Sequence, residues 1–125
     1  MNTPIYTPNA PAAIGPYSQA VQTGNMLFVS GQIPIDPATG VFAGEDIATQ
    51  TRQSLTNVSN ILAAAGYSLN DVVKTTVLLD DMANFAAVNA VYSEFFTENC
   101  PARACFAAKA LPKGALVEIE AIAAK

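Results

Sequence analysis

The residue of this 125-residue chain whose setting most favours chemistry is Arg103. It stands in the segment Pro101-Ala102-Arg103-Ala104-Cys105, between small residues and at the start of an apolar run. An arginine so placed either extends its charged tip to water from a sheet edge or holds a carboxylate or phosphate with its planar guanidinium. The small neighbours slightly favour the second role, because they let a ligand approach the backbone, but both interpretations stay open.

Two glutamates, Glu118 and Glu120, are candidates for proton transfer. The chain has no histidine, so the usual general base near neutral pH and the commonest metal ligand are both missing. The two acids are two residues apart in an alternating segment, which would place them on one face of a strand. That face is either solvated, or it partly buries one carboxyl group, whose raised pKa would then suit it to move a proton or orient water.

Neither cysteine has the surroundings of a nucleophile. A reactive Cys105 would need an activating base or cation; Arg103, two residues away on the same strand face, could lower its pKa. A small buried side chain is the simpler interpretation of Cys105. Cys100 and Cys105 have no metal-ligand partners and no CxxC spacing, so we expect no metal site and reduced thiols.

Four further residues could line a pocket. Tyr17 and Ser30 lie at the outer ends of a predicted hairpin, so both belong to the same end of its ribbon, and Gly31 follows directly. They could form a polar corner of a pocket, although a satisfied tyrosine hydroxyl and a strand-ending serine are an equally simple interpretation. Asn89 lies beside the apolar stripe of a predicted helix, where polar residues often cap or face solvent.

These residues must be positioned by strands and helices that occur in a recognisable order. Apolar residues at helical spacing predict helices over 46–65, ended by Gly66, and over 84–97. Alternating or β-branched segments predict strands at 17–22, 26–30, 72–79, 103–110 and 116–123. Residues 1–16, which are rich in proline, predict an extended lead-in with turns. The order predicts an α+β sandwich in which two helices pack on one face of a mixed sheet.

Composition limits the classes of function. The net charge is −4, and the six lysines and arginines are scattered, unlike the basic patch of a nucleic-acid binder. No apolar run approaches a membrane span, and the first residues lack signal-peptide features, so the expected location is the cytoplasm. With 51% hydrophobic and 13% charged residues, the chain favours burial between subunits of a homo-oligomer. The length predicts a single domain over residues 1–125.

Five short motifs together resemble the RidA family, also called YjgF/YER057c/UK114. They are A-P-A-A-I-G-P-Y-S-Q-A at 10–20, V-S-G-Q-I-P at 29–34, V-N at 88–89, P-A-R-A-C at 101–105 and V-E-I-E-A at 117–121. Their order and spacing extend the resemblance over essentially the whole chain. It implies a chorismate-mutase-like fold assembled as a homotrimer, with sites in clefts between neighbouring subunits.

The resemblance also implies an enamine/imine deaminase, a hydrolase that acts on C=N bonds. Such enzymes convert reactive 2-aminoacrylate/2-iminopropanoate and 2-iminobutanoate to 2-keto acids and ammonia. Pyridoxal-phosphate-dependent serine/threonine dehydratases release these intermediates, and the family needs no cofactor. The alternative is a non-catalytic trimer that senses small carboxylates or regulates a partner enzyme.

By position, the resemblance implies that Arg103 holds the substrate carboxylate, helped by the backbone N–H of Cys105. It implies that Glu118, rather than Glu120, orients water or moves a proton. The implied pocket-lining residues are Tyr17, Ser30, Gly31 and Asn89. The family commonly has an aromatic residue before P-A-R, where this chain has Cys100 in a loop that is also short. We expect this departure to bear on the size of the preferred substrate.

Overall fold

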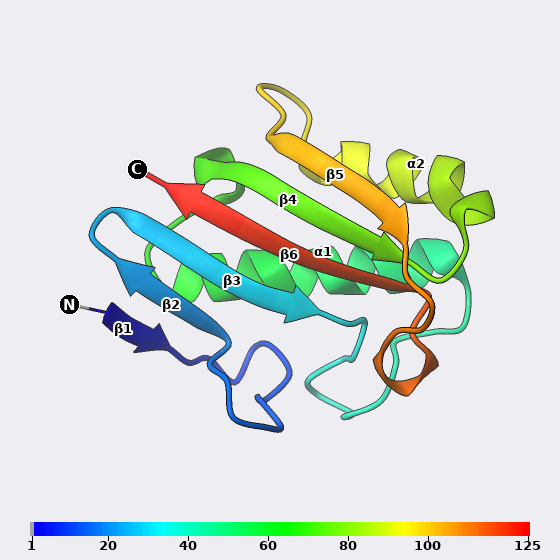
Figure 1. Ribbon diagram of the computed structural model, residues 1–125. Helices are drawn as coiled ribbons and strands as arrows, with labels where there is room; N and C mark the ends of the chain where they lie inside the picture. The colour runs from blue at the N-terminus through cyan, green and yellow to red at the C-terminus, as the bar shows by residue number, and fades with distance from the viewer. Residues whose placement is uncertain (1) are drawn as a thin grey trace.

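The computed structural model describes residues 2–125 and shows two layers, a six-stranded sheet and two helices packed on one of its faces (Figure 1). The strands are β1 (Asn2–Ile5), β2 (Ala20–Thr23), β3 (Met26–Gln32), β4 (Val72–Leu79), β5 (Ala102–Ala107) and β6 (Val117–Ala124). The helices are α1 (Ile47–Ala64) and α2 (Phe85–Phe95), and 3₁₀ turns occupy Leu69–Asp71, Met82–Asn84 and Pro112–Gly114. Within residues 2–125, no helix combines the length and apolar character needed to span a bilayer.

The order of strands across the sheet is β1-β2-β3-β6-β4-β5. β4 and β5 run parallel, with α2 between them in the chain, and the other neighbouring strands pair antiparallel. The mixed sheet with two helices on one face confirms the predicted α+β fold. The C-terminal strand β6 therefore lies inside the sheet, between β3 and β4, whereas β5 forms an edge (Figure 1).

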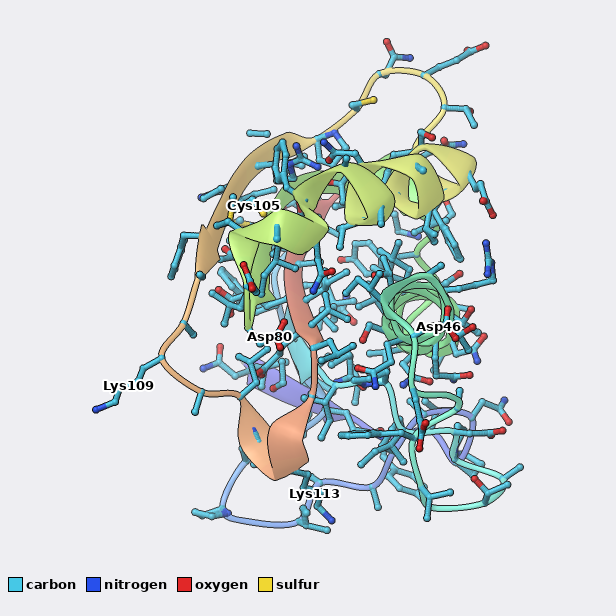
Figure 2. The ribbon with its side chains drawn as sticks, turned by 90° about the vertical axis from the view of Figure 1, so that its right-hand side faces the viewer. Asp46, Asp80, Cys105, Lys109 and Lys113 are labelled. Atoms are coloured by element: carbon cyan, nitrogen blue, oxygen red, sulfur yellow. The ribbon has the colours of Figure 1, made fainter. Side chains whose placement is uncertain are left out.

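Helix α1 begins and ends at residues whose chemistry explains its limits. The carboxylate of Asp46, at the start of the helix in Figure 2, accepts a hydrogen bond of 2.9 Å from the backbone N–H of Thr49. This contact satisfies one of the N–H groups that the first turn leaves free. Gly66 follows the last turn with φ at +82°, a conformation that costs glycine little. The prediction of a helix over 46–65 is confirmed to within one residue at each end.

The apolar core fills the space between the helices and one face of the sheet. From α1 it takes Leu55, Val58, Ile61 and Leu62, which are fully buried. From β6 it takes Val117, Ile119 and Ala121. Because side chains alternate along a strand, Glu118 and Glu120 lie on the opposite face of the sheet, as their spacing predicted.

The face of the sheet opposite the helices is here called the open face, because no helix of residues 2–125 packs on it (Figure 1). Glu118 lies opposite Leu78 on β4, which in turn lies opposite Phe106 on β5. Phe106 is 52% exposed, and Phe28 on β3 is 42% exposed. Large apolar side chains therefore lie on this face beside the two glutamates.

The sequence prediction missed one strand and set wrong limits for several elements, among them α2, which ends at Phe95 rather than at residue 97, and β3, which ends at Gln32 rather than at residue 30. β1 falls in the predicted lead-in and pairs with β2; as an edge strand it tolerates Pro4, which has no N–H to donate. β2 begins at Ala20 rather than at residue 17, because the preceding residues form the loop described below. β5 ends at Ala107 rather than at residue 110.

Candidate functional site

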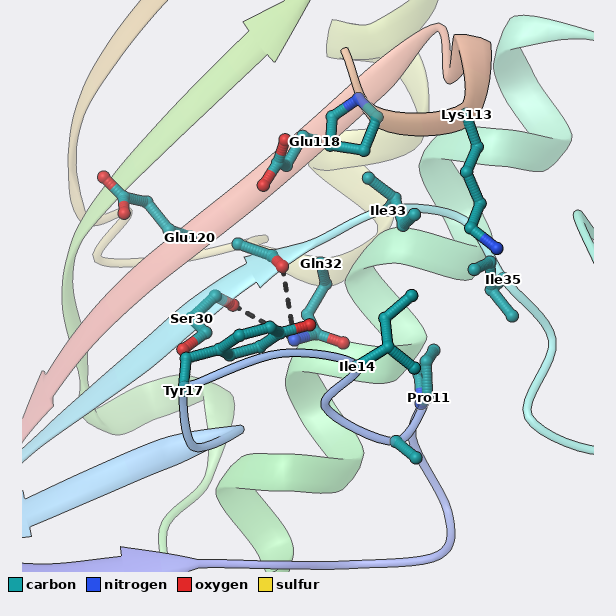
Figure 3. A pocket seen from close by; sticks show the side chains of 13 residues that line it. Pro11, Ile14, Tyr17, Ser30, Gln32, Ile33, Ile35, Lys113, Glu118 and Glu120 are labelled. Carbon is teal, nitrogen blue, oxygen red and sulfur yellow. Dashed lines mark hydrogen bonds between the residues drawn. The ribbon is translucent and has the colours of Figure 1, made fainter. Parts of the chain in front are cut away.

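A hollow of about 540 Å³ opens beside the end of β3, between the N-terminal loop and the Pro112–Gly114 turn (Figure 3). It is lined by four of the predicted site residues, which are Tyr17, Ser30, Gly31 and Glu118, and by Glu120. We call it the Glu118 pocket. Sequence analysis missed the other side chains that line it, most of them apolar, among them Ile14, Gln32, Ile33, Ile35 and Lys113.

A bulge in β3 shapes this pocket. Val29 of β3 pairs with Ala121 of β6, and Gln32 pairs with Ile119. Two residues of β3 therefore lie between these pairs, opposite only one residue of β6. The extra residue bends the strand and changes the direction of its side chains, which is why bulges are frequent next to active sites. Gly31 is one of the two enclosed residues, so the bulge brings its backbone against the side chains of β6.

Glu118 fits the pocket because Gly31 has no side chain. A Cβ atom at Gly31 would lie 2.9 Å from the carboxyl carbon of Glu118 and would overlap its carboxylate. Glu118 is half-buried, whereas Glu120 is exposed. Burial first, and the negative charge of Glu120 second, raise the pKa of Glu118 above its ordinary value. Of the two acids, Glu118 is therefore the better candidate to hold and release a proton.

Ser30 joins the pocket to the N-terminal loop. Its hydroxyl donates a 2.6 Å hydrogen bond to the carbonyl of Ser18, and its N–H donates to the carbonyl of Gln19 at 2.9 Å. The structure thus gives the Ser30 side chain a positioning contact. Tyr17, 51% exposed, lies next to this segment, and its ring and the Glu118 carboxylate approach the hollow from different sides (Figure 3).

Gln19 anchors the wall of the pocket, and sequence analysis did not single it out. Its side chain is 2% exposed and accepts a hydrogen bond of 2.7 Å from the N–H of Thr7. Its amide group donates to the carbonyls of Thr7, Ala10 and Pro11, the last at 2.8 Å. A glutamine with so many backbone partners replaces the regular hydrogen bonds that this loop lacks. Only its place within the A-P-A-A-I-G-P-Y-S-Q-A motif hinted at this role.

Arg103 lies away from the Glu118 pocket, on β5 beside helix α2. One of its terminal N–H groups donates to the side-chain oxygen of Asn89 at 2.8 Å. The guanidinium carbon lies 4.9 Å from the ring centre of Tyr92 and 5.5 Å from that of Phe85. These contacts hold the side chain, although the residue as a whole is exposed. Arg103 is thus both an edge residue and a side chain fixed by neighbours.

The two cysteines have different surroundings. Cys105 is half-buried and packs against the apolar core. Burial raises its pKa and outweighs the opposite effect of Arg103, so the activation by Arg103 that the spacing allowed does not occur. Cys100 is exposed in the loop before β5, where its thiol donates a weak 3.5 Å hydrogen bond to the carbonyl of Phe96.

The predicted site residues therefore form two groups within one chain. Glu118 lies on the open face of the sheet. Thr75 is buried and its side chain contacts Tyr92 of α2, so it lies on the face of the sheet that the helices cover. Arg103 lies opposite Thr75, and its side chain is therefore on that same face. The first group is Tyr17, Ser30, Gly31 and Glu118; the second is Asn89, Arg103 and Cys105. Strand β4 separates β5 from β6, and the structure does not bring the two groups together in a single chain.

No group of three or more cysteine, aspartate or glutamate side chains among residues 2–125 is arranged to hold a metal ion. The site residues themselves supply a carboxyl group with a raised pKa, that of Glu118, and a guanidinium held by its neighbours, that of Arg103.

Comparison with known proteins places this arrangement in a family. The family model described as Endoribonuclease L-PSP, which represents the RidA/YjgF proteins, matches residues 7–125. This chain belongs to the RidA family. The match confirms the resemblance that the five motifs predicted.

Relatives in the RidA family are similar to this chain over all or nearly all of its length. The 2-iminobutanoate/2-iminopropanoate deaminase of Salmonella typhimurium is 54% identical over 128 residues, which cover 100% of this chain and 99% of the relative. The crystal structure of the YjgF gene product of Escherichia coli has a TM-score of 0.94 and 53% identity, over 98% of each chain. The structure of E. coli TdcF with bound serine has a TM-score of 0.95 and 47% identity, again over 98% of each chain.

Proposed function

We propose that this protein is an enamine/imine deaminase that hydrolyses 2-iminopropanoate and 2-iminobutanoate to 2-keto acids and ammonia. The observation that carries the proposal is the half-buried Glu118, with its raised pKa, facing a pocket in a chain 54% identical to an enzyme named for this reaction. The substrates would come from pyridoxal-phosphate-dependent dehydratases that release enamines. We propose that residues 1–125 act as one domain and that the protein works in the cytoplasm.

The reaction needs a proton carrier and a placed water rather than a strong nucleophile. The enamine gains a proton at its terminal carbon and loses one from nitrogen, which gives the imine. Water then adds its oxygen to the imine carbon, protons move to nitrogen, and the C–N bond breaks to release ammonia and leave the keto group. Glu118 is suited to both stages, because a carboxyl group with a raised pKa can donate a proton and, once ionised, accept one from water.

The substrate also carries a carboxylate, which we assign to Arg103 together with the backbone N–H of Cys105. A planar guanidinium can bind a carboxylate with two parallel hydrogen bonds. Asn89 occupies only one terminal nitrogen of Arg103, at 2.8 Å, and the side chain is exposed. The guanidinium is therefore available to an anion that approaches from outside the chain.

Because Arg103 and Glu118 lie on different faces of the sheet, we propose that a complete site forms between two copies of the chain in a homotrimer. One subunit would supply Glu118 and its pocket, and the next would supply Arg103 and Asn89. The exposed Phe28 and Phe106 on the open face support such an assembly, since large apolar side chains gain stability when a partner covers them.

The activity is tested by coupling the protein to a serine or threonine dehydratase and following keto-acid formation. We expect the wild-type protein to accelerate the hydrolysis and Glu118→Gln to abolish most of that acceleration. Glu120→Gln, which removes the neighbouring exposed charge, is the matched control and should keep most of the activity. Equal rates for wild type and Glu118→Gln would show that the assignment of Glu118 is wrong.

The shared site is tested by mixing two inactive variants. Arg103→Ala and Glu118→Gln subunits, unfolded and refolded together, should regain activity, because about a quarter of the sites in a random equal mixture would combine an intact Arg103 with an intact Glu118. Refolding each variant alone should restore none. A mixture that stays inactive, although the subunits have exchanged, would rule out a site shared between subunits.

A non-catalytic sensor of small carboxylates is the second candidate, and the relative TdcF with bound serine favours it. Calorimetry with 2-ketobutyrate, set against turnover, separates the two: tight binding without accelerated imine hydrolysis would favour the sensor. The family description names an endoribonuclease, but a net charge of −4 and scattered basic residues do not favour RNA binding. Salt-sensitive binding of RNA by the pure protein would reverse that conclusion.

A further inference from the structure

Three side chains of α2 converge on the guanidinium of Arg103. They are Phe85, Asn89 and Tyr92, which are spaced so that they share one face of the helix. Asn89 accepts a hydrogen bond from Arg103, and the two aromatic rings lie 5.5 Å and 4.9 Å from its guanidinium carbon. Both distances lie within the range at which a cation is attracted to the face of a ring.

Tyr92 is itself fixed at both ends. Its hydroxyl and the hydroxyl of Thr75 form a hydrogen bond of 2.7 Å, and Tyr92 and Thr75 are 7% and 1% exposed. Its ring packs against Phe96, with ring centres 4.7 Å apart. The hydrogen bond and the ring contact therefore restrain Tyr92 beneath the guanidinium.

Thr75 also lies directly opposite Arg103 in the parallel pairing of β4 and β5. Arg103, Thr75 and Tyr92 are therefore each linked to the other two. Arg103 and Thr75 are paired across β5 and β4, Thr75 and Tyr92 share a hydrogen bond, and the ring of Tyr92 lies beside the guanidinium of Arg103. An exposed arginine would otherwise sample many rotamers and lose that freedom on binding a ligand.

We propose that Tyr92, held by Thr75 and assisted by Phe85, is a positioning residue that orients the guanidinium of Arg103 for a 2-keto or 2-imino carboxylate. This rests on the proposed role of Arg103. The aromatic rings orient the plane of the guanidinium, and Asn89 takes one of its nitrogens, so the outward nitrogens meet the carboxylate in a prepared geometry.

The test is calorimetric binding of 2-ketobutyrate to the assembled, folded protein. We expect Tyr92→Leu to weaken binding about 3- to 10-fold, which corresponds to the loss of one cation–π contact. Tyr92→Phe keeps the ring but loses the hydrogen bond that holds it to Thr75, so it should weaken binding, but less than Tyr92→Leu does. Phe85→Leu should also weaken binding, whereas Phe85→Tyr, which keeps an aromatic ring, should retain the affinity of the wild type. Because Phe85 is only half-buried, that pair stays informative if Tyr92→Leu fails to fold.

Tyr67→Leu is the matched control. Tyr67 is 5% exposed and also lies under a cation, but that cation is Lys125, whose Nζ lies 4.9 Å from the ring centre, rather than Arg103. A purely structural role for Tyr92 would make both leucine variants less stable and leave the affinity for 2-ketobutyrate unchanged in both. That result would overturn the inference. If Arg103→Ala itself binds 2-ketobutyrate as tightly as the wild type, the assignment of Arg103 fails first, which distinguishes the two failures.

Discussion

Gly31 and Glu118 compete for the same space at the bulge of β3. A Cβ atom at Gly31 would lie 2.9 Å from the carboxyl carbon of Glu118, closer than non-bonded atoms can pack. The missing side chain of one residue is therefore what allows the carboxylate of the other to face the pocket. Because the overlap involves the far end of a flexible side chain, a substitution at Gly31 should move Glu118 rather than unfold the protein.

Gly31→Ala should lower the rate of imine hydrolysis roughly 10- to 100-fold, because displacing a reacting group by about 1 Å can cost that much. The unfolding temperature should change little. The coupled dehydratase assay and thermal unfolding measure the two effects. In a Glu118→Gln background the same substitution should have almost no further effect on the rate. A full additional loss there would mean that Gly31 acts independently of Glu118.

Glu118→Gln should make the protein more resistant to unfolding at neutral pH. The fold raises the pKa of Glu118, so the folded protein binds this proton more tightly than the unfolded chain does. The group therefore favours folding at acidic pH, and that contribution is lost as the pH rises through its folded-state pKa. The free energy of unfolding is measured with urea at matched protein concentration, from about pH 4 to about pH 8. As the pH increases, the value for the variant should rise relative to that for the wild type. A constant difference across that range would contradict the raised pKa.

Arg103→Ala should lower kcat/KM roughly 30- to 1,000-fold, which corresponds to about 2–4 kcal/mol for losing a charge-assisted contact with the substrate carboxylate. Arg103→Lys should recover only part of the loss, since an ammonium group cannot form two parallel hydrogen bonds in one plane. Lys109→Ala is the matched control, because Lys109 is exposed and its side chain extends away from the fold (Figure 2). Similar losses at both positions would point to a general effect of charge.

Arg52→Gln should change the free energy of unfolding by less than about 1 kcal/mol, as expected for an exposed ion pair. Arg52 on α1 lies 3.1 Å from Glu94 on α2, but the two side chains are 48% and 54% exposed. Urea unfolding checks the stability, and the coupled assay should show unchanged turnover. A loss much larger than this would mean that the pair helps to hold α2, and with it Arg103, against the sheet.

The local pattern of the sequence was sufficient for the elements that depend on near neighbours. The helical spacing of Leu55, Val58 and Ile61 predicted α1, and Gly66 predicted its end. The alternation in β6 assigned Glu118 and Glu120 to one face of the sheet. These features follow from backbone periodicity and from the conformational freedom of glycine, which act over a few residues. The five motifs, taken together, were specific enough to indicate the family and its fold.

Only the tertiary structure decided how these elements combine. The sheet order places β6 between β3 and β4, and this long-range pairing brings Gly31 against Glu118. The difference between Glu118 and Glu120 also depends on it, because partial burial against a distant strand, rather than residue type, raises the pKa of Glu118. The same pairing leaves Arg103 at an edge strand on the opposite face, beside Tyr92 and Asn89. Alternation along a strand is a local property, but which strand lies next to it depends on the burial of apolar side chains across the whole chain.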